Sequence, residues 1–194
     1  MVITTDDVKK LRDETGVSIM QCKKALEEAG GDFEKAKVIL RKQSTAVASK
    51  KADRTLGAGI AAAYTHAGGS VVAAVVLACE TDFVAKNEAF GKLAYDIAMH
   101  VAAMSPLFRA HSDVQEDHMK AAKEIFAAEV ANVPEKAREL ALQGKLDSFL
   151  KERILLEQPY IKDSNMTVKQ LIDVAIQRFG EKIEVVRFER LSVK

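Results

Sequence analysis

Hydrophobic residues recur every three or four positions through the first 43 residues, in three segments separated by helix-ending signals. This spacing is typical of amphipathic helices. Thr5 can cap the first helix, and Gly16 can end it. Residues 18–21 have the S-x-x-Q form of a capping box, and Asp32 can cap a third helix. Residues 1–43 are therefore predicted to form a three-helix module, with apolar faces made by Val8, Leu11, Ile19, Cys22, Leu26, Ala29, Phe33, Ala36, Ile39 and Leu40.

A small and polar stretch, residues 44–55, follows the module and is predicted to be a linker, either helical or flexible. Two apolar runs then flank the sequence A-G-G-S, which predicts a β-hairpin over residues 57–79. Near the other end of the chain, residues 182–192 are predicted to form a strand that returns to pair with this hairpin. The predicted core domain spans residues 56–194.

Helical periodicity dominates residues 88–179, between the hairpin and the last strand. Apolar residues from Phe90 onward keep a 3.6-residue period until Pro106 ends that helix. A second helix is predicted from a capping box at residues 112–115 to about residue 130, and two more near residues 134–143 and over residues 147–156. A loop is predicted over residues 156–165. The last helix is predicted from a capping box at Thr167 to Gly180, which can serve as its C-cap. The predicted fold class is α+β, in which a three-helix module precedes a small antiparallel three-stranded sheet packed against helices.

Opposite charges nearly cancel, with 29 Lys and Arg against 28 Asp and Glu, so the net charge of +1 creates no global field for nucleic acid or an anionic membrane. Lysine pairs occur, but acidic neighbours dilute them, and solvated helix faces are the favoured interpretation. There is no basic-then-apolar leader and no run of 18 apolar residues. We expect a cytoplasmic protein without direct contact to nucleic acid or membrane, in which Cys22 and Cys79 are buried thiols.

The common motifs of catalysis and cofactor binding do not occur in the sequence. It has no phosphate-binding loop, no complete dinucleotide fingerprint, no nucleophile elbow and no Cys/His cluster with zinc spacing. His111 and His118 lie seven positions apart, but no third ligand accompanies them. Asp82 has no partner in the sequence that would make it a general acid or base. We therefore expect no bond-making or bond-breaking activity, no cofactor and no resident metal.

The stretch CETDFVAKNEAF, residues 79–90, joins the hairpin to the first helix of the core. In this joint an acid, Asp82, stands beside a large aromatic residue, Phe83. One interpretation is that Phe83 fills the protein's own core while Asp82 closes the turn. The other is that the pair is exposed for a partner, in which case Val84 is the better core candidate. The residue types alone leave both interpretations open.

Three separated segments resemble the elongation factor Ts family of bacteria and organelles: CETDFVAKNEAF, ETGVSIMQCKKALEEAGGDFEKA, and LLEQPYIKD with the TVKQLI and FGEKIEVVRFERLSV that follow it. The resemblance implies a guanine nucleotide exchange factor that binds the GDP and nucleotide-free forms of the GTPase elongation factor Tu in translation elongation. It also implies a ubiquitin-associated-like N-terminal module. Because this chain has a single core, it resembles the short form of the family, which acts as a homodimer.

The resemblance also implies roles for individual residues. In the family, the joint inserts between two helices of the GTPase and displaces its Mg²⁺; the matching residues here are Thr81, Asp82, Phe83 and Val84. Positions that dock on a helix of the GTPase domain match Arg12, Ile19, Met20 and Lys23. Ile19 could instead belong to the module's own core. Phe179 and Gly180 match another contact region.

Two other classes of function stay open on the sequence. A generic adaptor would use the helical module to bind ubiquitin-like or other helical partners. An enzyme would use an unrecognised site centred on Asp82. Retention of one abundant GTPase from a bacterial lysate would separate an exchange factor from an adaptor, and turnover of a small molecule without any GTPase would indicate an enzyme.

Overall fold

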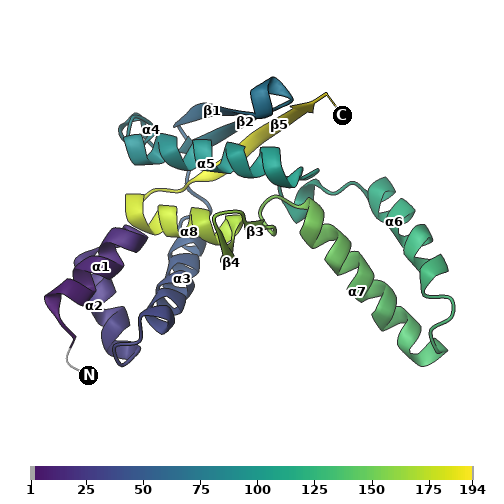
Figure 1. Ribbon diagram of the computed structural model, residues 1–194, viewed down its shortest axis with the longest axis horizontal. Helices are drawn as coiled ribbons and strands as arrows, with labels where there is room; N and C mark the ends of the chain where they lie inside the picture. Colours follow the sequence, from purple (N-terminus) through teal and green to yellow (C-terminus); the bar gives the residue numbers. More distant parts are fainter. Residues whose placement is uncertain (1–2, 194) are drawn as a thin grey trace.

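The computed structural model describes residues 3–193, which form an α+β fold (Figure 1). The α-helices in that range are α1 (Thr5–Thr15), α2 (Ile19–Glu28), α3 (Phe33–Ser49), α4 (Asp82–Ala85), α5 (Glu88–Met104), α6 (Glu116–Glu129), α7 (Glu135–Arg153) and α8 (Val168–Phe179). The strands are β1 (Ala58–His66), β2 (Val71–Cys79), β3 (Pro159–Tyr160), β4 (Asp163–Thr167) and β5 (Glu184–Ser192). Strands β1, β2 and β5 form an antiparallel sheet in the order β1-β2-β5. The predicted α+β class and three-stranded sheet are confirmed, while residues 1–2 and 194 of the predicted domains lie outside the described range.

Helices α1 to α3 enclose a small core of their own, made by the buried side chains of Val8, Leu11, Val17, Cys22, Ala25, Leu26, Ala36 and Leu40. The predicted caps at Ser18 and Asp32 are confirmed, because each side chain accepts a hydrogen bond from a backbone N–H group in the first turn that follows. The prediction for the first helix was wrong by one residue. Thr4 is the N-cap, because its hydroxyl accepts from the N–H of Asp7 while the carboxylate of Asp7 accepts from the N–H of Thr4.

Helix α3 joins the module to the core without a break. It continues through residues 44–49, so this part of the predicted linker takes the helical alternative, and only residues 50–55 turn toward β1. The extension packs along α8, where the hydroxyl of Thr45 donates to the buried carboxylate of Asp173 at 2.9 Å. A continuous helix with polar contacts along its length fixes the module's position on the core.

The main core lies under one face of the three-stranded sheet (Figure 1). The sheet register places Ala62 opposite Val75 and Val75 opposite Phe188, which puts these three side chains on the same face. Helix α5 covers that face, and α8 packs into the same core. The buried side chains of this main core include Ala73, Val75, Leu77, Cys79, Val84, Phe90, Ile97, Val101, Ile172, Ile176 and Val185. Within residues 3–193, no helix covers the opposite face of the sheet.

Helices α6 and α7 form an antiparallel hairpin that projects away from the sheet (Figure 1). The capping box predicted at residues 112–115 does not start an α-helix, because residues 111–113 form a short 3-10 turn and the hydroxyl of Ser112 donates to Asp113 at 3.1 Å. The guanidinium of Arg109 binds both carboxylate oxygens of Asp113, at 3.1 and 3.2 Å. Helix α6 begins at Glu116 instead. The helices predicted over residues 134–143 and 147–156 are one helix, α7, in which Gly144 is exposed and leaves the helix intact.

The predicted loop over residues 156–165 was also wrong in part, because β3 and the start of β4 lie within it. Its Gln158 is fully buried. The side-chain amide of Gln158 donates to the carbonyl of Glu152 at 2.7 Å, and its oxygen lies 2.9 Å from Nε2 of His100. This segment therefore ties the end of α7 to α5.

Candidate functional site

The joint between β2 and α5 is the short helix α4 with its own cap. Thr81 is the N-cap, and its hydroxyl accepts from the N–H of Val84 at 3.5 Å. Asp82 places a negative charge in the first turn, where it interacts favourably with the positive end of the helix dipole. Because the helix has only four residues, it acts as a tight turn that displays its side chains in different directions.

Phe83 points outward from this turn, and Val84 points inward. The side chain of Phe83 is 81% exposed, whereas that of Val84 is 5% exposed and belongs to the main core. Successive residues of a helix are rotated by about 100°, so the burial of Val84 turns the Phe83 ring into solvent. The interpretation in which Phe83 fills the protein's own core is therefore wrong.

Asp82 lies beside Phe83 on the surface. Its carboxylate binds Nζ of Lys86 at 2.6 Å, and the two side chains are 74% and 77% exposed. An exposed ion pair of this kind adds little to stability. Asp82 can therefore exchange Lys86 for a partner's hydrogen-bond donors at small cost.

Two carboxylates that sequence reasoning did not single out lie beside the turn. Glu181 accepts hydrogen bonds from the backbone N–H groups of Glu80 and Thr81, and Glu80 accepts one from the N–H of Lys182. The bond from Lys182 holds the pKa of Glu80 below its usual value, and Arg54 acts in the same direction. Glu181 and Thr81 are 100 positions apart, so no local sequence signal could have paired them.

The residues predicted to dock a partner lie on the module's surface at the end of α1 and the start of α2. Ile19 is 58% exposed and Met20 is 76% exposed, so the alternative that places Ile19 in the module's own core is wrong. Arg12 and Lys23 are exposed beside them. Their ion pairs, to acidic residues of their own helices, are exposed as well. Ile19 and Met20 open α2, Lys23 follows one turn later and Arg12 lies in the last turn of α1; we call these four exposed residues the module patch.

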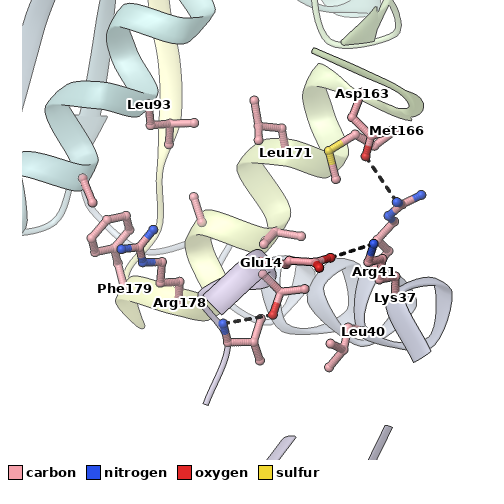
Figure 2. A pocket seen from close by; sticks show the side chains of 15 residues that line it. Glu14, Lys37, Leu40, Arg41, Leu93, Asp163, Met166, Leu171, Arg178 and Phe179 are labelled. Atoms are coloured by element: carbon pink, nitrogen blue, oxygen red, sulfur yellow. Dashed lines mark hydrogen bonds and ion pairs between the residues drawn. The ribbon is translucent and has the colours of Figure 1, made fainter. Parts of the chain in front are cut away.

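Phe179 is the last residue of α8 and lines a pocket (Figure 2), and Gly180 is the C-cap that follows it. Phe179 is half-buried, and its ring meets Phe90 edge-to-face with 5.9 Å between the centroids. Gly180 has φ of +74°, a backbone conformation that favours glycine, and the predicted C-cap is confirmed. Its carbonyl accepts from Nζ of Lys51 at 2.7 Å. Phe179 is thus shared between the core and the pocket wall.

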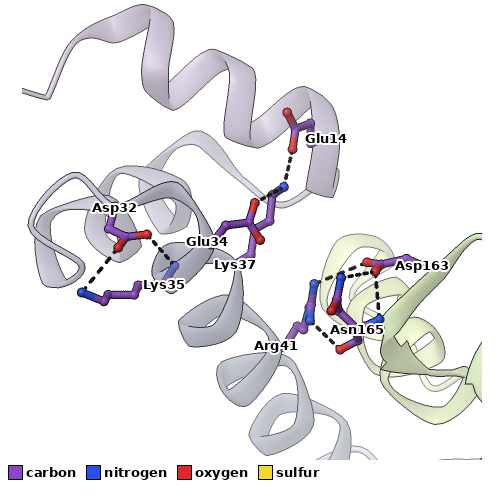
Figure 3. A network of polar contacts seen from close by, with 8 residues as sticks. All are labelled: Glu14, Asp32, Glu34, Lys35, Lys37, Arg41, Asp163 and Asn165. Atoms are coloured by element: carbon purple, nitrogen blue, oxygen red, sulfur yellow. Dashed lines mark hydrogen bonds and ion pairs between the residues drawn. The ribbon is translucent and has the colours of Figure 1, made fainter.

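The pocket has a volume of about 480 Å³ and lies between the module and α8. Leu171 and other apolar side chains form its wall, and charged pairs stand at its edge (Figures 2 and 3). Lys37 binds Glu14 within the module at 2.8 Å, and that contact raises the pKa of Lys37. Arg41 lies 3.4 Å from Asp163 and so links α3 to β4. The Arg41–Asp163 pair therefore helps to hold the module on the core, whereas the Lys37–Glu14 pair joins two helices of the module.

Within the part of the chain that the structure describes, no three His, Cys, Asp or Glu side chains lie together as a metal ion would require. His118 instead meets Phe108 edge-on, with 5.2 Å between the ring centroids. None of the helices in residues 3–193 is long and apolar enough to cross a bilayer. Cys22 and Cys79 are buried free thiols, as predicted.

The exposed candidate positions lie at the same end of the molecule's long axis (Figure 1). Helix α4, the C-terminal end of α8, and helices α1 and α2 all lie there, and the α6–α7 hairpin lies at the other end. A single large partner could therefore contact the Phe83 turn and the module together.

Comparison with known proteins identifies the family. The family model described as Elongation factor TS matches residues 46–194. An elongation factor Ts of Desulforamulus reducens is 48% identical over 193 residues, which cover 98% of this chain and 89% of the relative. Elongation factor Ts of Thermotoga maritima is 46% identical and covers 100% of this chain and 97% of the relative, and that of Moorella thermoacetica is 46% identical and covers 99% and 96%. The chain belongs to the elongation factor Ts family.

Proposed function

We propose that the chain is a guanine nucleotide exchange factor for elongation factor Tu and acts in translation elongation in the cytoplasm. The observation that carries this proposal is Phe83, a bulky aromatic residue that is 81% exposed on a capped turn. Membership of the elongation factor Ts family supports the choice of partner. The module at the same end of the molecule supports a second contact with the same GTPase.

The Phe83 turn acts as a wedge. Burial of the ring in a seam between two helices of the GTPase contributes about 1.5–3 kcal/mol toward opening that seam. Asp82 brings a negative charge to the groups around the bound Mg²⁺, while Thr81 caps the turn and Val84 anchors it. Disturbing the Mg²⁺ shell removes counter-charge from the GDP phosphates, and GDP leaves.

Exchange by this route needs no covalent step. The chain must bind nucleotide-free elongation factor Tu more tightly than it binds the GDP form. Because the coupling between the two binding sites is reciprocal, the bound chain then lowers the affinity for GDP by the same ratio. GTP completes the cycle when it binds and displaces the factor. The chain accordingly works by binding, without a cofactor or metal of its own and without contact to nucleic acid or membrane.

The N-terminal module provides the second contact. Ile19 and Met20 pack on a helix of the GTPase domain, and Arg12 and Lys23 supply flanking positive charge. A ubiquitin-associated-like arrangement of α1 to α3 is part of this proposal, as is the division into a module, a linker and a core. Phe179 and Gly180 form a further contact where α8 ends.

A second copy of the chain covers the open face of the sheet. That face carries small exposed residues, Ala61, Ala63 and Ala74, beside the larger apolar side chains of Val76 and Leu191. Val76 is 39% exposed and Leu191 is 69% exposed. Small residues allow two sheets to approach closely, and a self-complementary patch suits a twofold homodimer.

The competing functions have weaker support. An enzyme centred on Asp82 would place its acid in a pocket, whereas this carboxylate is 74% exposed and bound to Lys86. An adaptor that uses only the module would give the Phe83 turn no role.

Release of fluorescent GDP from purified elongation factor Tu tests the proposed function. With the full-length chain added, release should accelerate and reach a saturating rate as the concentration of the chain rises. A rate equal to that of elongation factor Tu alone would reject the exchange function, and binding without acceleration would favour the adaptor.

A further inference from the structure

The carboxylate of Glu181 accepts three hydrogen bonds from the strand end that leads into the Phe83 turn. Its Oε2 accepts from the backbone N–H groups of Glu80 and Thr81, both at 3.0 Å, and its Oε1 accepts from the hydroxyl of Thr81 at 2.6 Å. Hydrogen bonds to an ionised carboxylate are shorter and stronger than neutral ones. Because Thr81 is the N-cap of α4, Glu181 holds the residue from which the turn begins.

Glu80 makes the reciprocal contact. Its Oε1 accepts from the backbone N–H of Lys182 at 2.5 Å, and the same carboxylate binds the guanidinium of Arg54 at 3.2 Å. The segments 80–81 and 181–182 are therefore joined by one carboxylate from each, and we call this pair of contacts the carboxylate brace. It connects the end of β2 to the segment between α8 and β5.

The brace lies where the sheet no longer holds the chain. The pairing of β2 with β5 ends at Ala78, opposite Glu184, so the residues that follow have no partner in β5. Helix α4 has four residues and a long capping bond of 3.5 Å, and Val84 is its buried anchor. Ala85 packs against the same core beside Val84, so these apolar contacts hold the second half of the turn, while Sγ of Cys79 donates to the carbonyl of Thr81 at 3.2 Å. A second fixed point at Thr81 sets the direction of the Phe83 ring.

We propose that Glu181 is a positioning residue for nucleotide exchange, which fixes the direction of Phe83 through Thr81 without itself contacting the GTPase. This inference rests on the proposed function, because that function gives Phe83 its role as a wedge. A turn held in one direction has already lost the conformational freedom that insertion would otherwise remove. Loss of the brace should therefore slow the insertion step while the module still docks.

The test measures fluorescent GDP release from elongation factor Tu across a series of concentrations of full-length variants. Glu181→Ala should lower the saturating rate by roughly three- to thirtyfold, which lies inside the span for coupled residues of one network, with a smaller change in the half-saturating concentration. Glu181→Gln should recover part of the rate, because its amide oxygen still accepts a hydrogen bond. In a Phe83→Ala background, Glu181→Ala should have no further effect on the rate.

Glu129→Ala is the matched control, because it removes a carboxylate that binds Lys145 at 2.7 Å in the distant α6–α7 hairpin. This variant should exchange at the parental rate. The inference is overturned if Glu181→Ala keeps the parental saturating rate while Phe83→Ala is slow, or if the two effects multiply in the double variant. If Glu181→Ala fails to fold, Glu181→Gln is judged by the same two criteria. A parental rate for Phe83→Ala would instead reject the wedge, and with it both the proposed mechanism and the role of Glu181.

Discussion

At the scale of single residues, the proposed role of Phe83 as a wedge depends on the residues that hold its turn. Val84 anchors the turn in the core, Thr81 caps it, and Glu181 holds Thr81. An aromatic side chain on a mobile loop would lose freedom when a partner bound it, and that loss would weaken binding. A turn that is already held in place avoids most of this loss of conformational freedom. The free energy gained by burying the ring is then available to open the partner.

His100 carries a prediction about pH. It is fully buried, its Nδ1 accepts from the N–H of Ile161 at 3.3 Å, and its Nε2 donates to Gln158 at 2.9 Å. Burial lowers the pKa of His100 below its usual value. The unfolded chain therefore takes up a proton at a pH where the folded chain does not, and the free energy of unfolding should fall as pH drops below about 6.5.

Urea denaturation between pH 8 and pH 5 measures this effect. His100→Gln should be less stable at pH 8 and should show a shallower decline toward pH 5, because its side chain cannot be protonated. His66→Gln is the control, since His66 is exposed, and it should keep the parental slope. Equal slopes for His100→Gln and the parental chain would contradict the assignment.

Several residues whose role depends on near neighbours were predicted from the sequence, although the cap of the first helix was misplaced by one residue. Ser18, Asp32 and Gly180 end or begin helices through bonds within a few positions, and all three were predicted correctly. The joint at Phe83 was found as a candidate, but its orientation follows from the burial of Val84 in three-dimensional packing. Glu181 was missed because its partners lie about a hundred positions away.

At the scale of elements, α3 is the last helix of the module and also packs against the main core. Its N-terminal part helps to enclose the module's own core, and residues 44–49 pack on α8. The position of the module patch relative to the Phe83 turn is thus set by a continuous helix. A flexible linker would have left that position free.

Arg41 tests this arrangement. Its guanidinium donates to the carbonyl of Asn165 at 2.8 Å and lies 3.4 Å from Asp163, and its side chain is 15% exposed (Figure 3). Arg41→Ala should weaken the docking of α3 by about 1.5–3 kcal/mol, the range for hydrogen bonds to charged groups. Hydrogen–deuterium exchange should then rise in α1 to α3, while β1 and β2 keep their protection.

Arg138→Ala is the matched control, because Arg138 donates to the carbonyls of Ala131 and Val133 within the projecting hairpin. It should leave exchange in α1 to α3 unchanged. Unchanged exchange in Arg41→Ala as well would show that the apolar contacts between α3 and α8 suffice to hold the module.

The helix boundaries that sequence reasoning misplaced by more than one residue lie in and beside the α6–α7 hairpin. At residues 112–115 the hydroxyl of Ser112 donates to Asp113 within a short 3-10 turn, and the α-helix begins later, at Glu116. Gly144 sits where the sequence suggested a gap between two helices, and α7 runs through it on an exposed face. The sheet and α5 were predicted well because their apolar patterns are long and regular.

At the scale of the whole molecule, three surfaces have separate places. The Phe83 turn and the module patch lie at one end, the α6–α7 hairpin lies at the other, and the open sheet face lies on the side away from α5 (Figure 1). A homodimer joined through the sheets would leave both docking ends exposed. Each copy could then engage its own elongation factor Tu.

Val76→Glu tests the dimer. Val76 lies in the central strand on the open face, opposite Arg187, whose guanidinium binds Glu189. A second copy covering this face would therefore bury an added carboxylate that has to compete with Glu189 for Arg187. Sedimentation velocity should show a dimer for the parental chain and a monomer for Val76→Glu. Ile125→Glu, at a side chain 61% exposed on α6, should remain a dimer. A parental monomer, or a dimeric Val76→Glu variant, would reject the sheet face as the interface.

The most direct test of the account is the rate at which Phe83→Ala releases fluorescent GDP from elongation factor Tu. Leu140→Ala is the matched control, because Leu140 is 79% exposed on the distant hairpin. We expect a saturating rate roughly tenfold or more below that of the parental chain for Phe83→Ala, in line with about 1.5–3 kcal/mol of lost burial, at an unchanged melting temperature. Leu140→Ala should match the parental rate. A parental rate for Phe83→Ala would contradict the claim that this ring opens the GTPase.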